Sequence, residues 1–341
     1  MHEQTLWHPV AAQADLAAQP LALTLLGEPL VLWRDGAGQA HAFVDRCPHR
    51  GTPLSMGRVH QGRLECAYHG WQFEGGGRCV HIPAVPEHAP TPSHAAHAHD
   101  VRAAHGLWWV RLAGDVAAAR EGAAPETSAV PGLTGLPPRQ VVCGPYDVAT
   151  SAPRVVENFL DTSHFGFVHE GWLGDRAHTA VPAYDVVAGP DGAPAVAHYR
   201  AWQPQASALA TGGAWVAYRY EVLSPYSALL IKQADAPVEG ATGGDDPDAP
   251  APQEAYALWV CPVSPEASRV WFTLFTNDTA SSDASLRAFQ HSIFTQDQPV
   301  LEAQRPRCLP LHGGEVHSAA DRLSTAYRRY LRAQNISFGV C

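Results

Sequence analysis

The sequence has little of what a secreted or membrane protein would show. Its N-terminus has no basic segment ahead of an apolar core, and no run reaches about 18 uninterrupted apolar residues. The seven cysteines are odd in number and widely scattered, which argues against a disulfide framework. We therefore expect a soluble, cytoplasmic protein.

Positive charge is also scarce in this chain. Lysine and arginine number 23 against 33 aspartates and glutamates, the formal net charge is −10, and Lys232 is the only lysine. This balance argues against nucleic acid as a partner. The sequence also lacks a Gly-x-Gly-x-x-Gly strand-to-helix motif with which to bind the nicotinamide of NAD(P)H itself.

Two short segments each combine one cysteine with one histidine. Cys47-Pro-His49 is followed, after sixteen intervening residues, by Cys66-Ala-Tyr-His69. Two thiolates and two imidazoles are the ligands of a Rieske [2Fe–2S] cluster, with the cysteines on one iron and the histidines on the other. Zinc uses the same residue types, but its sites usually pair Cys with Cys and His with His. The mixed turns favour the cluster and leave zinc as an alternative.

A second group of candidate ligands surrounds His164 and His169. These histidines are five residues apart on an expected helix from Pro153 to about His169, and an ideal helix would not place them on one face. We expect a distortion or a helix end at Gly166 to bring them together. Two imidazoles and one carboxylate are the ligands of a non-haem Fe(II) centre that activates O₂.

The carboxylate of such a centre must come from elsewhere in the chain. We choose Asp297, on an expected helix over residues 283–304, with Glu302 and Asp321 as rivals. Asp161 lies three residues before His164, on the same face of the expected helix, so we expect it to be a partner of His164 and not a ligand.

The chain divides into two regions of different pattern. Residues 1 to about 115 read as all-β, with a hairpin at Gly75–Gly77, and a linker of Ala, Gly, Pro and Glu follows from about 114 to 140. The second half combines strands between about 183 and 275 with helices near both ends, the last over about 319–333. We predict an α+β protein of two domains, 1–120 and 121–341.

The segment Asp235–Gln253 is acidic and rich in glycine and proline. Such a composition cannot build a core, so we expect a mobile surface loop, either a flap near a substrate entrance or an inert insertion.

On these residues the chain resembles the oxygenase component of the Rieske non-haem iron oxygenases, over nearly its whole length. The family's second motif, Asn-x-x-Asp-x-x-His-x-x-x-x-His, corresponds to Asn158, Asp161, His164 and His169. Trp7-His-Pro-Val and residues 297–306 resemble the methylxanthine N-demethylase branch. Residues 169–176, 326–331 and 338–341 resemble the saxitoxin-pathway hydroxylases, and the dicamba monooxygenase and vanillate demethylase group is more distantly similar.

The resemblance implies an N-terminal all-β Rieske domain and a catalytic domain with a curved antiparallel sheet and helices, of the helix-grip type. It implies a cluster on Cys47, His49, Cys66 and His69, a mononuclear Fe(II) on His164, His169 and Asp297, and catalytic roles for Asp161 and Asn158. It also implies a homotrimer, in which Asp161 bridges His164 and His69 of the adjacent subunit, and a flavin/iron–sulfur reductase or ferredoxin as electron donor.

The expected activity is O₂-dependent monooxygenation, by C–H hydroxylation or N/O-demethylation, of a small ring compound that contains nitrogen. The alternative is an aromatic O-demethylase or ring dihydroxylase acting on a benzenoid acid, for which Lys232 could hold the carboxylate. Another alternative is a Rieske electron carrier without oxygenase activity. Such a protein would need only about the first third of this chain, which would leave residues 158–297 without a role. Candidate pocket residues are aromatic or hydrogen-bonding: Phe165, Trp172, Trp202, Trp215, Tyr218, Phe294, Asn158, Gln233 and Asn277.

Overall fold

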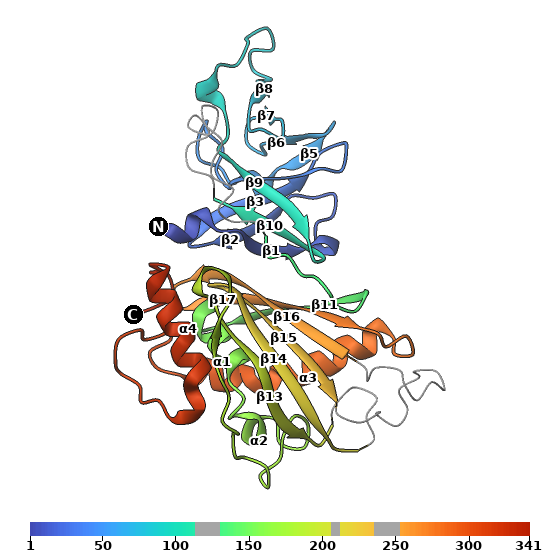
Figure 1. Ribbon diagram of the computed structural model, residues 1–341. Helices are drawn as coiled ribbons and strands as arrows, with labels where there is room; N and C mark the ends of the chain where they lie inside the picture. The colour runs from blue at the N-terminus through green and yellow to red at the C-terminus, as the bar shows by residue number, and fades with distance from the viewer. Residues whose placement is uncertain (113–129, 206–211, 235–252) are drawn as a thin grey trace. The chain divides into compact units, whose positions relative to one another are not determined.

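The computed structural model describes residues 1–112, 130–205, 212–234 and 253–341. They form two compact units, Met1–Val130 and Pro131–Cys341, each described here by itself (Figure 1). The expected domain boundary at residue 120 and the segment 235–252 lie outside the described residues. No helix among the described residues has the length and apolar character needed to cross a membrane.

The first unit contains a six-stranded antiparallel sheet in the order β1-β10-β9-β4-β3-β2. Its core comes from apolar runs such as Leu30–Trp33, whose side chains are fully buried. The strand expected over 106–112 pairs with both β1 and β9. The bounds are β1 His8–Ala12, β2 Leu21–Leu25, β3 Glu28–Arg34, β4 Ala40–Val44, β9 Ala98–Ala104 and β10 Leu107–Arg111.

A second sheet of four strands carries the cysteine and histidine turns of this unit. Its order is β5 (Arg58–His60), β6 (Arg63–Glu65), β7 (Gln72–Phe73) and β8 (Cys79–His81). β7 and β8 are joined by the expected hairpin, in which Gly77 has φ +83° and lies against the carbonyl oxygen of Ala96 with no room for a Cβ. Cys47 and Cys66 are buried in the same apolar cluster as Phe73.

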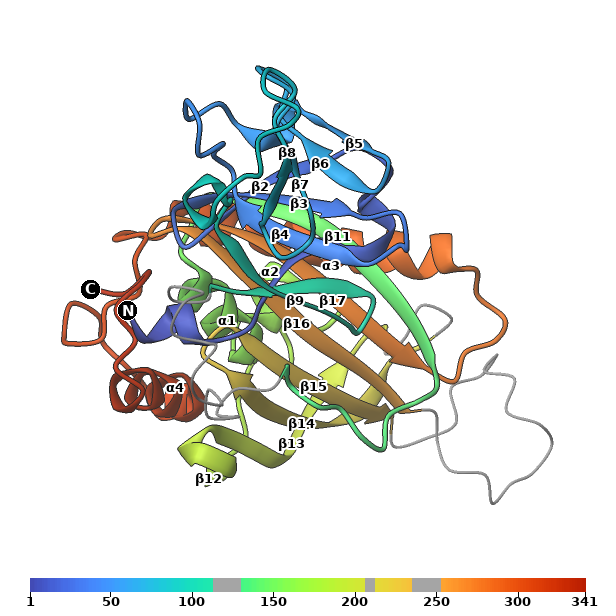
Figure 2. The same cartoon turned by 90° about the horizontal axis from the view of Figure 1, so that it is seen from above.

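The second unit is built on a seven-stranded antiparallel sheet in the order β11-β17-β16-β15-β14-β13-β12. Two helices, α1 (Ala152–Leu160) and α3 (Asp283–Ala303), touch each other and face this sheet, while α4 (Arg322–Ala333) packs on β13 (Figure 1). Seen from above, α3 lies beside β11 and α4 lies near the opposite edge (Figure 2). The strands are β11 Arg139–Val148, β12 Val187–Ala188, β13 Pro194–Gln203, β14 Ala214–Ser224, β15 Ser227–Ala234, β16 Gln253–Ser264 and β17 Ala267–Thr276. The expected α+β class is confirmed.

The single helix expected from Pro153 to His169 is wrong. The chain forms α1 (Ala152–Leu160) and, after a break, the one-turn helix α2 (Phe165–Val168). The break begins at Asp161, whose backbone is extended and whose Oδ1 accepts hydrogen bonds from the Ser163 amide at 2.8 Å and hydroxyl at 2.6 Å. Such a local side-chain bond competes with the helical bond of the same backbone.

The two later helices are where the sequence predicts them. α3 spans Asp283–Ala303, and the hydroxyl of Ser282 accepts the Ser285 amide at its N-cap. α4 spans Arg322–Ala333, preceded by a 3₁₀ turn at Ala319–Asp321.

Candidate metal centres

The two cysteine and histidine turns share one backbone construction. The amide of Gly51 donates to the carbonyl of Cys47 at 2.9 Å, and the amide of Gly70 donates to the carbonyl of Cys66 at 3.0 Å. Both glycines have positive φ, +75° and +70°, which closes each turn without strain. Each turn therefore presents its histidine next to its cysteine.

The side chains of these turns come together in two pairs, one of histidines and one of cysteines. The rings of His49 and His69 have centroids 4.5 Å apart, and the Cys47 thiol contacts that of Cys66. Burial raises the pKa of Cys47 to about 11, and Cys66 adds to the rise. A thiol in such a place ionises when a cation binds it, so the raised pKa is compatible with a metal ligand.

The surroundings of His49 fit an iron–sulfur cluster. Its Nδ1 is buried and has no hydrogen-bond partner among the described residues, and its ring stacks on Trp71 with centroids 4.6 Å apart. A buried polar atom without a partner costs free energy unless something binds it. Two imidazoles beside two buried thiols fit the donor set of a [2Fe–2S] Rieske centre.

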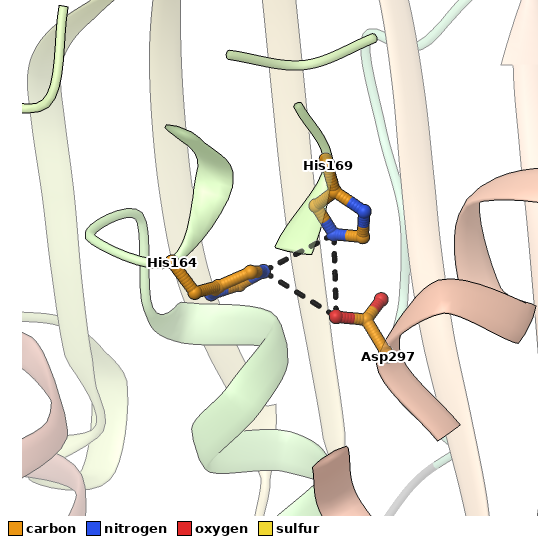
Figure 3. A group of neighbouring side chains, drawn as sticks. All are labelled: His164, His169 and Asp297. Atoms are coloured by element: carbon orange, nitrogen blue, oxygen red, sulfur yellow. Dashed lines mark hydrogen bonds and ion pairs between the residues drawn. The ribbon is translucent and has the colours of Figure 1, made fainter. Parts of the chain in front are cut away.

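A second cluster of possible ligands lies in the second unit. His164, His169 and Asp297 point toward one another, with ligand atoms within 4.8 Å (Figure 3). The Nε2 atoms of the histidines are 3.2 Å apart, and Asp297 Oδ1 lies 3.4 Å from His164 Nε2 and 3.2 Å from His169 Nε2. Two imidazoles and one carboxylate in such a group fit a mononuclear iron with open positions.

The one-turn helix α2 explains how histidines five residues apart can meet. His164 is its N-cap and His169 its C-cap, so both stand outside the helical turn. The expected distortion at Gly166 is wrong, because Gly166 lies inside α2. Gly166 instead lies where two backbone segments pack closely. A Cβ at Gly166 would lie 2.8 Å from the carbonyl oxygen of Asp175, and a Cβ at Gly174 would lie 2.7 Å from the Gly166 nitrogen.

Each histidine is oriented through its other ring nitrogen. His164 Nδ1 donates to Asp161 Oδ2 at 3.1 Å, and His169 Nδ1 donates to Gln296 Oε1 at 2.8 Å. Both Nε2 atoms then carry lone pairs toward the centre, as metal-binding histidines require. Gln296 was not among the sequence-based candidates, although it is the neighbour of Asp297.

Asp161 and His164 form a polarised pair inside the unit. Burial opposes ionisation of Asp161, but its bonds to His164 and Ser163 lower its pKa. Burial likewise opposes the charged form of His164, yet the hydrogen bond and charge of Asp161 raise its pKa. The carboxylate therefore stays ionised and holds the proton of His164 on Nδ1.

Asn158 and the rival carboxylates occupy different places. Asn158 Nδ2 donates to Asp297 Oδ1 at 3.3 Å, so α1 supports the cluster directly. Glu302 accepts the Ala149 amide at 3.1 Å and also binds Gln298, while Asp321 caps a 3₁₀ turn. Neither rival belongs to the histidine group.

A cavity adjoins the three ligands between the sheet and α3. Of the expected pocket residues, Phe165, Tyr218, Phe294 and Asn158 line it, and so does Lys232. The other five were wrong: the described lining does not include Trp172, Trp202, Trp215, Gln233 or Asn277. Trp202 and Trp215 instead pair with each other, with centroids 5.9 Å apart, beside a separate hollow.

α1, which carries Asn158, is tied to the C-terminal helix by buried charges. Arg328 of α4 donates to both carboxylate oxygens of Glu157, at 2.5 and 2.7 Å, and also bonds Glu315. Glu315 in turn accepts from Arg154 at 2.6 Å. A bidentate arginine–carboxylate pair fixes the relative geometry of the two groups as well as stabilising them. The pair therefore holds α1 in place where it lines the cavity.

Two family models match the chain. The Rieske [2Fe-2S] domain matches residues 6–96, and the vanillate O-demethylase oxygenase C-terminal domain matches residues 148–334. The methylxanthine N1-demethylase of Pseudomonas putida is 30% identical over 337 residues, covering 96% of this chain and 87% of that protein. The dicamba O-demethylase oxygenase component of Stenotrophomonas maltophilia is 35% identical over 179 residues, covering 52% of this chain and 49% of that protein.

The fold also resembles solved structures. The structure of NdmA from Pseudomonas putida CBB5 with caffeine superposes with a TM-score of 0.79 at 27% identity, covering 97% of this chain and 90% of that chain. Dicamba monooxygenase bound to dicamba shares the fold, with a TM-score of 0.73 at 24% identity and coverage of 98% of both chains.

Proposed function

Because this chain belongs to the Rieske-type oxygenases with a vanillate O-demethylase C-terminal domain, we propose that it inserts one oxygen atom of O₂ into a small nitrogen-containing ring compound. The observation that carries the proposal is the convergence of His164, His169 and Asp297 beside a largely apolar cavity. Such a cavity with a few placed polar groups suits a small rigid ring.

We assign the electron-accepting cluster to Cys47, His49, Cys66 and His69. The two buried cysteines supply thiolates, and the unpartnered Nδ1 of His49 supplies one imidazole nitrogen. Trp71 stacks on His49 and covers one face of that ring. Histidine in place of cysteine raises the reduction potential of the cluster, which suits an acceptor of reductase electrons.

The mononuclear site is held by His164, His169 and Asp297 in this proposal. Iron bound there would supply the reductive activation of O₂ and the insertion of oxygen into a C–H bond. Asp161 and Gln296 keep the Nε2 atoms of the histidines aimed at the centre, and Asn158 holds the Asp297 carboxylate. Apolar lining such as Phe294 and Leu258 excludes water around the reacting carbon.

Relatives of this chain are oxygenase components of systems with several proteins. We propose that a flavin/iron–sulfur reductase or a ferredoxin supplies the electrons, and that the chain forms a homotrimer. In the trimer, Asp161 would accept a hydrogen bond from His69 of the adjacent subunit while keeping the one from His164. Light scattering of the holoenzyme during size-exclusion chromatography measures this oligomeric state directly.

The proposal is tested by O₂ uptake with a surrogate reductase on N-methylated heterocycles such as caffeine. For an N-methyl group, one O₂, two electrons and two protons give the demethylated compound, one formaldehyde and one water. We expect a red-brown protein, with formaldehyde formed in a one-to-one ratio to the O₂ consumed. A colourless protein with one zinc per chain would end this interpretation.

The second candidate function is action on a benzenoid acid, and Lys232 in the cavity is the observation that favours it. Its cation could bind a substrate carboxylate. Product mass separates the cases: coupled turnover of vanillate or dicamba, with none of the N-methyl compounds, would establish the acid as substrate.

A further inference from the structure

One end of the substrate cavity is polar because of a row of residues across three strands. Tyr218 of β14 pairs with Lys232 of β15, which pairs with Glu254 of β16. Lys232 lines the cavity and is only 6% exposed, and its Nζ lies 3.0 Å from Glu254 Oε2. The single lysine of the chain is thus buried in an ion pair beside the substrate space.

The neighbouring rows of the sheet are increasingly apolar. Tyr220 pairs with Leu230, which pairs with Tyr256, and in the next row Leu258 pairs with Phe272. All five of these residues line the cavity. A ligand that spans these rows meets apolar and aromatic walls over most of its length and, at one end, Lys232, which is paired with Glu254.

Tyr256 reinforces the carboxylate side of this pair. Its hydroxyl donates to Glu254 Oε2 at 3.1 Å, and its ring lies 5.2 Å from Lys232 Nζ. Burial and the neighbouring Glu254 hold the pKa of Tyr256 well above its ordinary value, so the hydroxyl stays protonated and remains a donor. Glu254 Oε2 therefore receives both the ammonium and the phenol.

This arrangement changes what Lys232 can recognise. A lone buried ammonium would attract a carboxylate strongly, but an ammonium paired with Glu254 forms a unit without net charge. A ligand carboxylate placed there would have to share one cation with the Glu254 carboxylate, whereas a carbonyl oxygen needs only an N–H donor. The pair is therefore suited to a neutral acceptor and disfavours an acid.

We infer that Lys232 is a substrate-binding residue that donates a hydrogen bond to a ring carbonyl, and that Glu254 is a positioning residue that excludes acids. The substrate class is then a neutral, carbonyl-bearing nitrogen heterocycle. This inference rests on the proposed function and selects between its two substrate classes.

The test measures equilibrium binding to the holoenzyme by calorimetry, without reductase, for caffeine, theobromine and dicamba. Caffeine and theobromine are neutral with ring carbonyls, and dicamba is a carboxylate. We expect the wild type to prefer the neutral compounds. Glu254→Gln should lower the affinity for caffeine and raise the affinity for dicamba, each by on the order of tenfold. Glu254→Asp should restore the wild-type preference for the neutral compounds. Glu221→Gln, an exposed partner of Arg219 on β14, is the matched control and should change neither.

Lys232→Met should lose caffeine binding, and if it fails to fold, the uncharged double variant Lys232→Met/Glu254→Gln serves instead. Retained caffeine affinity in either variant overturns the inference. So does an equal effect of Glu254→Gln on both ligand classes, or the absence of wild-type binding to both neutral compounds. Lys232-dependent binding without any O₂ uptake would refute the proposed function and leave this recognition intact, whereas normal turnover with unchanged selectivity would refute only the recognition.

Discussion

Asp297→Ala is expected to abolish turnover and remove the mononuclear iron while leaving the visible spectrum of the cluster unchanged. Asp297 Oδ1 lies within 3.4 Å of both histidine Nε2 atoms and is the only carboxylate that the described residues contribute to this group. Without it, two neutral imidazoles remain, a set that holds Fe(II) poorly and leaves its charge uncompensated. The cluster ligands belong to the other unit and should be unaffected.

The measurements are iron per chain, the cluster absorbance and single-turnover product. Glu302→Ala is the matched control because Glu302 lies on the same helix, five residues farther on, and binds a backbone amide instead of the histidines. It should keep both iron and activity. If Asp297→Ala kept its iron and its turnover, Asp297 would not be a ligand.

Asp161→Asn is expected to reduce turnover by about 10- to 100-fold with both metal centres still occupied at saturating iron. The carboxylate accepts the Nδ1 proton of His164 at 3.1 Å. An amide is a poorer acceptor and can turn its NH₂ group toward the ring, which would favour the wrong tautomer. In a trimer, the same change would also weaken the proposed bond to His69 of the adjacent subunit.

Rapid reduction and reoxidation of the cluster, followed by its absorbance, would show whether electron delivery or chemistry is slowed. Ser163→Ala is the matched control, since it removes the other side-chain partner of Asp161, at 2.6 Å, and leaves the bond to His164. It should cost little activity. Near-normal turnover in Asp161→Asn would show that Asp161 only shapes the turn after α1.

The parts of the site that depend on short sequence spacing could be predicted from the sequence. The four candidate cluster ligands lie in two short turns, each with one cysteine and one histidine close in sequence. In the structure the two histidines lie together, and so do the two cysteines. Asp297 could be proposed because a carboxylate was needed and Asp297 lies on the helix expected over residues 283–304. Gln296 could not, because a neutral amide has no distinctive pattern, and only its contact with His169 identifies it.

The residues that line the cavity were harder to predict, because several of them lie on strands. Side chains alternate between the faces of a strand, so a choice that is off by one residue is on the wrong face. Lys232 lines the cavity and the next residue, Gln233, is exposed instead; similarly, Trp215 is 43% exposed while Val216 is buried. The break after α1 was missed because the bonds of Asp161 to Ser163 outweigh a good helical pattern.

The backbone packing of Gly166 against Gly174 and Asp175 has a consequence for how this protein can diversify. The turn that carries His164 and His169 packs closely on the main chain of Gly174 and Asp175, with the Thr179 side chain also close to Gly166. Any side chain at Gly166 would meet the Asp175 carbonyl and displace the short turn whose two ends are His164 and His169. A variant with a changed substrate range is therefore expected to keep glycine at both Gly166 and Gly174.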